Sequence, residues 1–184
     1  MASAHRVLDK SLEYTKKQGK IANTRGFFFE KQIQDVIDKT KYKPSKLAYK
    51  YISKTLKLNN KAITDFDAIL QVGTTLVAIS CKSILQTDIY DKGDFKSIRN
   101  VTSSIEGYMD DWKTKIKLVN ENKKGDNYDF SSFDDILGIV LTPTIFYIGT
   151  SFYAELDIKG LYTHMSQAEL IKWLEESSNE IIEK

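Results

Sequence analysis

The first third of the chain carries its hydrophobic residues at helical spacing. Apolar side chains recur every three or four positions over residues 4–19 and again over residues 27–39, and the polar residues 23–26 separate the two runs. Pro44, which suits the first turn of a helix, precedes a third run over residues 45–57. The pattern therefore predicts three successive amphipathic helices in this part of the chain.

The hydrophobic period changes after Ala62, where apolar and β-branched residues begin to follow one another closely. Residues 63–72 and 75–82 are rich in such residues, which is typical of strands. The two runs flank Gly73, and glycine suits a tight turn between paired strands. The pattern therefore predicts a β-hairpin.

The second half of the chain combines helical and extended patterns. Apolar residues every three or four positions over residues 95–119 predict a helix of about 25 residues. Two strand-like runs follow, at residues 136–141 and 144–148, and a shorter extended piece lies near Leu161. These extended segments are candidates to join the hairpin in one sheet.

The last predicted helix has a recognisable start, because Ser166 and Glu169 have the spacing of a capping box. The predicted elements together follow the order αααββαββα. This order predicts an α/β fold of the α+β kind, with a mixed sheet flanked by helices rather than a doubly wound parallel sheet. We expect residues 1–184 to form a single domain.

The composition is that of a folded protein, with 41% hydrophobic and 28% charged residues among 184. The longest apolar runs, residues 27–29 and 136–140, fall far below the roughly 18 residues that a membrane helix needs. No signal peptide is expected, since the first 25 residues are charged throughout. The single cysteine, Cys81, lies in an apolar run, which favours a reducing compartment. We therefore expect a cytoplasmic protein with no membrane partner.

The net charge of +2 hides a strong division along the chain. Residues 1–62 hold 15 lysines and arginines against 5 acids, whereas the remainder holds 12 against 20. A positive segment of this kind neutralises phosphates, which predicts nucleic acid, either DNA or RNA, as a partner. Basic side chains also recur along one side of the predicted third helix, at Lys46, Lys50, Lys54 and Lys57. The alternative is that these lysines only form solvated helix faces.

Two charged residues stand at the open end of the predicted hairpin. Asp67 lies in the first strand and Lys82 ends the second, so a turn at Gly73 brings them to the same end of adjacent strands. Lysine is rarely buried without a partner, and Asp67 is the nearest candidate. In one cleft, a carboxylate can bind a divalent cation while a lysine orients or deprotonates an attacking water.

These residues resemble the core of a known family. Asp67, a hydrophobic strand, a glycine turn, a second hydrophobic strand and Cys81-Lys82 are similar to the hairpin of the PD-(D/E)xK nuclease superfamily. Residues 26–30, Gly-Phe-Phe-Phe-Glu, resemble its first core helix, which often brings a glutamate to the metal site. Among subfamilies, the pattern is most like the nuclease domain of CARF-containing effectors of type III CRISPR immunity. The resemblance covers about residues 20–150. It implies a restriction-endonuclease-like core and a metal-dependent endonuclease.

The same resemblance implies the residues of the site. Mg²⁺ or Mn²⁺ is expected between Asp67, Glu30 and the backbone carbonyl of Cys81, with Lys82 near the water that attacks phosphorus. Ser80 stands where the family usually has a second acid, and a serine assists there only as a hydrogen-bond donor. The side chains expected to approach the nucleic-acid backbone are Arg25, Lys46, Lys50 and Lys54.

Two later acids are candidates to replace the one lost at Ser80. Asp94 lies twelve residues after Lys82, which is similar to a branch of restriction endonucleases that takes the missing acid from the following helix. The alternative is that Asp94 is an ordinary N-cap ahead of that helix. Glu106 is the second candidate, and its alternative is a charge on a solvated helix face.

Two rival hypotheses stay open. One, motivated by Ser80, is a nuclease fold that has lost catalysis and serves as a module binding nucleic acid or a protein partner. The other, compatible with the small size and the apolar helix faces, is a nuclease domain that works as a homodimer or within a larger complex. Exposure of Trp112 or Trp173 on the surface would favour this last hypothesis.

Overall fold

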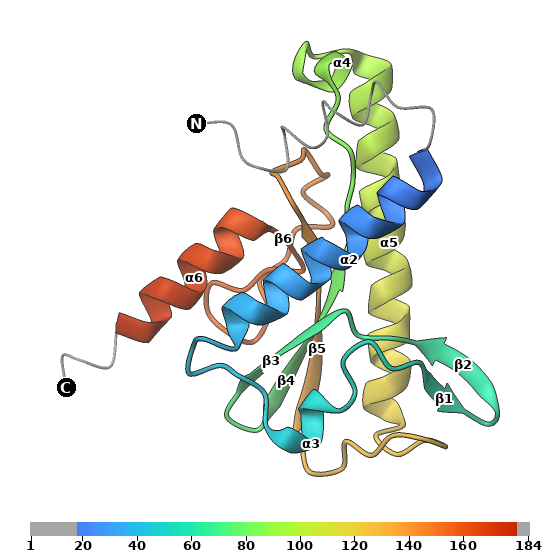
Figure 1. Ribbon diagram of the computed structural model, residues 1–184, viewed down its shortest axis with the longest axis vertical. Helices are drawn as coiled ribbons and strands as arrows, with labels where there is room; N and C mark the ends of the chain where they lie inside the picture. The colour runs from blue at the N-terminus through green and yellow to red at the C-terminus, as the bar shows by residue number, and fades with distance from the viewer. Residues whose placement is uncertain (1–17, 180–184) are drawn as a thin grey trace.

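The computed structural model describes residues 18–179 of the chain, and its centre is a four-stranded mixed sheet (Figure 1). The strands lie in the order β3 (Ala68–Val72), β4 (Thr75–Cys81), β5 (Asp135–Thr142) and β6 (His164–Ser166). β3 and β4 are antiparallel, whereas β5 is parallel to β4 and β6 is parallel to β5. The sheet therefore combines a hairpin with two crossover connections.

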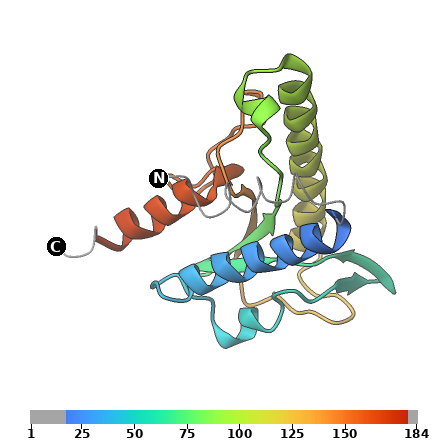
Figure 2. The same cartoon turned by 45° about the horizontal axis from the view of Figure 1, so that its top comes forward.

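Helices cover both faces of this sheet. α5 (Phe95–Glu121) packs on one face, and α2 (Gln18–Ile37) and α6 (Gln167–Asn179) pack on the other. Successive strand residues alternate between the two faces, so Ile69 belongs to the core under α5 and Leu70 to the core under α2. In Figure 2, α5 rises beside the sheet on the side away from α6. The predicted mixed sheet flanked by helices is thus confirmed.

A glycine lets the longest helix approach the sheet closely. A Cβ atom at Gly138 of β5 would lie only 2.7 Å from Cγ1 of Ile116 and 2.8 Å from Nε1 of Trp112. Both of these side chains belong to α5 and are buried. A larger residue at this position would therefore push α5 away from β5.

Short elements connect these layers. They are α3 (Lys46–Tyr49), β1 (Leu56–Leu58), β2 (Lys61–Thr64) and α4 (Asp88–Asp91). β1 and β2 pair with each other as a separate two-stranded ribbon, which projects from the body in Figure 1. None of the helices in the described part of the chain is long and apolar enough to cross a membrane.

The tip of the β1–β2 ribbon is held by one carboxylate. Asn59 and Asn60 form the turn with φ values of +53° and +61°, a left-handed conformation that asparagine tolerates. Asp126 accepts hydrogen bonds from both backbone N–H groups, at 3.2 Å from Asn59 and 2.7 Å from Asn60. The ribbon is therefore fixed to the loop that follows α5.

Several predicted elements agree with the structure. β3 and β4 form the predicted hairpin, and Gly73 in its turn has a φ of +59°. Its first strand begins at Ala68 rather than at residue 63, because residues 61–64 form β2 and pair with β1. α5 begins at Phe95, and β5 covers the strand predicted over residues 136–141. The capping box is also present, because Ser166 N and Oγ each donate to Glu169 Oε2 at 2.7 Å and Glu169 N donates to Ser166 Oγ at 3.3 Å.

The helix predicted over residues 45–57 is wrong beyond its first turn. α3 ends at Tyr49, and the chain then turns through Ser53, whose φ is +55° and whose N–H donates to the Phe66 carbonyl at 2.7 Å. Tyr51 packs into the core, with its ring centroid 4.7 Å from that of Phe130. Contacts with residues distant in sequence therefore override the helical pattern.

The predicted break at residues 23–26 is also wrong, because α2 runs without interruption from residue 18 to residue 37. Gly26 causes no break, since helices tolerate an isolated glycine at a cost of about 1 kcal/mol. Most of the helix predicted over residues 4–19 lies outside the described residues.

The strand predicted over residues 144–148 is absent. The chain leaves the sheet after β5, and Thr142 Oγ1 donates to the carbonyl of Thr144 at 2.8 Å. β6 pairs with β5 in its place, a few residues beyond the extended piece predicted near Leu161. The apolar side chain of Phe146 is nevertheless buried, against the core under α5, which explains why the segment resembles a strand in sequence.

Candidate functional site

The candidate site lies at the end of the β3–β4 hairpin away from its turn. Asp67 directly precedes β3, and its N–H donates to the Ile79 carbonyl at 3.1 Å. Lys82 directly follows β4, and its N–H donates to the Leu141 carbonyl of β5 at 2.7 Å. The two residues thus stand at the same end of adjacent strands, as the sequence predicts, with their backbones held by the sheet.

The Asp67 carboxylate is half-buried and holds the end of β4. Its Oδ2 accepts a hydrogen bond from the backbone N–H of Cys81 at 2.7 Å. Burial raises the pKa of Asp67 to about 6, because removing water disfavours the charged form. The Cys81 hydrogen bond and the Lys82 ammonium lower this pKa, whereas the carboxylates of Glu30 and Asp65 raise it. The site therefore holds more negative than positive charge.

Glu30 reaches the same region from α2. Burial raises the pKa of Glu30, the nearby Asp65 carboxylate raises it further, and the Lys82 ammonium lowers it. The helix is anchored on the sheet by Phe29 and Ile33, which are fully buried. Glu30 is thus held in electrostatic contact with the acids and the lysine of the hairpin.

An open cavity of about 650 Å³ lies beside these charges. It is bounded by α2, by the segment that follows β4, and by the first half of α5. Its lining includes Gly26, Phe27, Glu30, Cys81, Lys82 and Tyr108. Asp67 does not line the cavity, but its carboxylate binds the N–H of Cys81, which does. A ligand in this cavity would therefore meet Glu30 and Lys82 directly.

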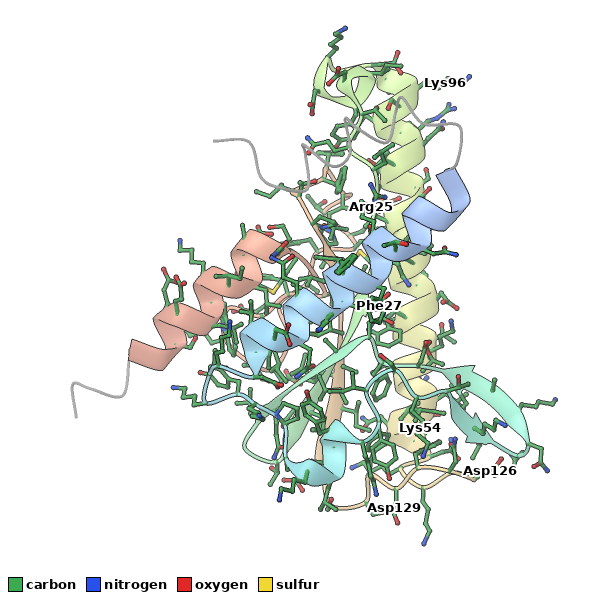
Figure 3. The ribbon with its side chains drawn as sticks, viewed as in Figure 1. Arg25, Phe27, Lys54, Lys96, Asp126 and Asp129 are labelled. Carbon is green, nitrogen blue, oxygen red and sulfur yellow. The ribbon has the colours of Figure 1, made fainter. Side chains whose placement is uncertain are left out.

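The α2 wall of the cavity comes from one stripe of the helix. Its members share a face because each lies three or four positions from another member of the stripe. They are Asn23, Gly26, Phe27 and Glu30. Figure 3 shows Phe27 and Arg25 on this helix. Only Glu30 of this stripe is predicted from the sequence as a site residue. The exposure of one phenylalanine could have been predicted as well, since three consecutive phenylalanines in a helix cannot all face the core.

Arg25 ties α2 to the hairpin. Its Nη2 donates a hydrogen bond to the carbonyl of Ser83, in the segment directly after β4. The side chain is half-buried. That Arg25 approaches a nucleic-acid backbone stays a prediction, and in the structure its hydrogen bond joins α2 to the segment after β4.

The lysines predicted to line one side of a third helix, here called the basic ridge, do not form a helix face, because α3 is only one turn long. Lys46 is exposed on α3, and Lys50 and Lys54 follow it with their ammonium groups 4.8 Å and 5.3 Å from the ring centroid of Tyr51. Lys54 also donates to the carbonyl of Asn127 at 3.0 Å. None of these lysines lines the cavity, and Figure 3 shows Lys54 near the β1–β2 ribbon rather than beside Arg25.

The acids considered as replacements for a second carboxylate have other partners. Asp94 caps α5, with its Oδ1 accepting from the N–H of Ser97 at 2.7 Å, as the N-cap alternative predicts. Glu106 Oε1 accepts from the N–H of Gly149 at 3.0 Å. Ser80 itself is buried, with 5% of its surface exposed.

Over residues 18–179, the structure gathers no group of three or more acidic, histidine or cysteine side chains suited to hold a metal ion. The carboxylates that interact at the site are those of Glu30, Asp65 and Asp67. The two tryptophans whose exposure would favour a dimer are buried, with Trp112 4% and Trp173 8% exposed.

Comparisons of the chain with protein-family models, with curated proteins and with solved structures find no match.

Proposed function

We propose that this chain is a metal-dependent endonuclease that hydrolyses phosphodiester bonds in DNA or RNA. The observation that carries the proposal is the meeting of Asp67, Glu30 and Lys82 at one end of the hairpin, beside an open cavity. The order of the elements supports it, since a helix with a glutamate precedes an Asp-bearing hairpin that ends in lysine. This order resembles the restriction-endonuclease-like core of the PD-(D/E)xK nucleases.

The donor atoms suit Mg²⁺ or Mn²⁺. Both ions prefer oxygen ligands, and Mg²⁺ is commonly held by one or two carboxylates while it keeps several waters. The pKa values of Asp67 and Glu30 are both raised, so their negative charges are poorly compensated in the protein alone. Asp67, Glu30 and the Cys81 carbonyl are the groups that would hold the ion. When bound, the ion would polarise a phosphoryl oxygen and stabilise the charge that develops on it.

The chain's own residues have separate tasks in this proposal. Cys81 N–H holds Oδ2 of Asp67 and thereby orients the carboxylate, which leaves Oδ1 as the oxygen for a ligand. Lys82 lines the cavity, where its ammonium orients the attacking water and faces the scissile phosphate. Glu30 contributes its carboxylate from the opposite wall. Ser80 is buried in β4 and contributes no charge.

Cleavage of labelled nucleic acid tests the proposal. The purified chain is incubated with end-labelled single- and double-stranded DNA and RNA in the presence of Mn²⁺, beside the variants Asp67→Asn and Lys82→Ala. Each variant is expected to lose on the order of 10²-fold or more in rate. Asp134→Asn is the matched control, because Asp134 is an exposed carboxylate beside the hairpin turn, where it accepts from Thr74 Oγ1 at 2.6 Å. Cutting that survives both site variants would remove Asp67 and Lys82 from the mechanism.

A second candidate function is a degenerate nuclease fold that binds nucleic acid or a protein partner without cutting. Ser80 favours it, because this position lacks the usual acid, and Asp94 and Glu106 are engaged elsewhere. Calorimetric titration with MnCl₂ separates the two functions. A saturable heat that disappears in Asp67→Asn supports the nuclease, whereas the absence of saturable binding to the wild-type chain supports the degenerate module.

A further inference from the structure

The cavity has an exposed aromatic side chain on each of two walls. Phe27 of α2 lines it and is 62% exposed, and Tyr108 of α5 lines it and is 42% exposed. Single exposed aromatic residues are common on protein surfaces, but two that face one concave space beside charged groups are characteristic of ligand sites. The two rings therefore suit a ligand with a flat, apolar face.

The rest of the lining combines the apolar side chains of Ile84 and Val101 with polar groups. Asn23 and Asn100 contribute side-chain amides, which can both donate and accept hydrogen bonds. Among the described residues that line the cavity, Lys82 is the one cation and Glu30 the one carboxylate. The Lys82 ammonium lies 5.3 Å from the ring centroid of Tyr108. Such a lining suits a nucleobase, which combines a π-face with donors and acceptors at its edge.

We propose that Phe27 and Tyr108 form a subsite for an unstacked nucleobase next to the scissile phosphate, and that the substrate is a single-stranded nucleic acid. This inference rests on the endonuclease function proposed above. In a duplex, the faces of the bases are covered by their neighbours, so exposed rings gain nothing from them unless the duplex opens. In a single strand every base offers a face, and stacking on an aromatic side chain stabilises binding without regard to sequence.

The charge of the cavity favours the same substrate. Binding to duplex backbone depends on several lysines or arginines that neutralise phosphates. Arg25 beside the cavity is bonded to the Ser83 carbonyl, and Lys46, Lys50 and Lys54 do not line it. Among the residues whose side chains the structure describes, Lys82 is the one cation that lines the cavity, so this part of the chain offers stacking rather than a row of cations. The cavity volume of about 650 Å³ lies within the range of small-molecule sites, which suits a nucleotide unit and not the width of a duplex.

The neighbouring residue provides a matched control. Phe28 is also 62% exposed and its ring centroid lies 6.1 Å from that of Phe27, but it does not line the cavity. Phe27→Ala and Phe28→Ala therefore remove the same side chain from adjacent, equally exposed positions. Because both residues are exposed, neither change empties a core position.

The experiment measures binding without cleavage. Fluorescence anisotropy in EDTA measures binding of the chain of residues 1–184 to dye-labelled single strands of about 12 nucleotides, as DNA and as RNA, and to the matching duplexes. Phe27→Ala is expected to weaken single-strand binding about 5- to 140-fold, the range for loss of one stacked base. Phe27→Tyr should retain the affinity, and Phe28→Ala should change it little. A strand with abasic sites should bind weakly and should not distinguish Phe27→Ala from the wild type.

Two results would overturn the base subsite. One is an equal loss of affinity in Phe27→Ala and Phe28→Ala, which would indicate a general surface effect. The other is a duplex bound more tightly than the single strand and independent of Phe27. The cleavage assay with Mn²⁺ separates this failure from that of the proposed function. Cutting that needs Asp67 but not Phe27 refutes the subsite alone, whereas no binding and no cutting of any strand refutes both.

Discussion

The raised pKa of Asp67 predicts that this residue destabilises the fold at neutral pH. Its pKa is about 6 in the folded protein, against 3.8 for an exposed aspartate. The folded chain therefore binds more protons than the unfolded chain between these two pH values, so the free energy of unfolding falls as pH rises through this window. The penalty grows from about 1 kcal/mol at pH 4.5 to about 3 kcal/mol at pH 7.5, at 1.36 kcal/mol per pKa unit.

Asp67→Asn removes this ionisation while it keeps the size of the side chain. The amide oxygen can still accept the hydrogen bond that Cys81 N–H donates at 2.7 Å. At pH 4.5 the folded wild-type carboxyl is mostly protonated, because its pKa is about 6, whereas at pH 7.5 it is charged. The stronger bond that the charged form accepts from Cys81 N–H lowers this pKa, so it is already included in the value. The pH dependence therefore measures the net cost of ionising Asp67 in the folded protein.

Urea denaturation of the wild type and of Asp67→Asn at pH 4.5 and pH 7.5 measures the effect. Relative to the wild type, Asp67→Asn is expected to be about 2 kcal/mol more stable at pH 7.5 than at pH 4.5. Asp134→Asn controls for loss of a negative charge at the other end of the sheet. A relative stability of Asp67→Asn that is the same at both pH values, or that declines at pH 7.5, would refute the reasoning.

Further predictions concern packing, capping and the role of one acid. Gly138→Ala should lower the free energy of unfolding by about 1–3 kcal/mol, because its Cβ would overlap α5. Gly107→Ala, at an exposed position of α5 with open space around it, should raise the free energy of unfolding by about 0.5–1 kcal/mol. Urea denaturation that ranks the two variants the other way contradicts the close approach of α5 to β5. Ser166→Ala should cost about 1 kcal/mol in the same measurement, through loss of the capping box, and an unchanged midpoint would argue against it. Asp94→Asn should leave Mn²⁺-dependent cleavage unchanged because the asparagine still caps α5, and a loss of rate near 10²-fold at unchanged stability would instead identify Asp94 as a metal ligand.

The parts of the fold that could be predicted from sequence are those in which local pattern and tertiary contacts agree. The hairpin of β3 and β4 is one, because Gly73 fixes the turn and alternate residues of both strands face opposite cores. α5 is another, since its apolar stripe alone requires a long helix on the sheet. The chain after α3 could not be predicted in this way. Ser53 bonds to Phe66 and Tyr51 packs on Phe130, and these contacts are invisible in the local spacing.

The candidate site also has a part that could be predicted from the sequence and a part that could not. Hairpin register brings Asp67 and Lys82 to one end of the sheet, so their proximity follows from sequence. The hydrogen bond from Cys81 N–H to Asp67 could not be predicted, because it depends on the side-chain rotamer at the strand's end. The basic ridge failed because it assumed that residues 45–57 are helical. Four lysines that share a face only in a helix lose that relationship when the helix stops at Tyr49.

α2 links the proposed chemistry to the proposed recognition. Phe27 and Glu30 are three positions apart, so one face of the helix presents both the ring that would stack on a base and the carboxylate that would hold an ion. Their position relative to the hairpin is set by the burial of Phe29 and by the bond from Arg25 to Ser83. A rotation of α2 about its axis would therefore move both groups together. For this reason we expect base stacking and cleavage to be lost in concert when α2 is displaced, and separately only when Phe27 or Glu30 is replaced alone.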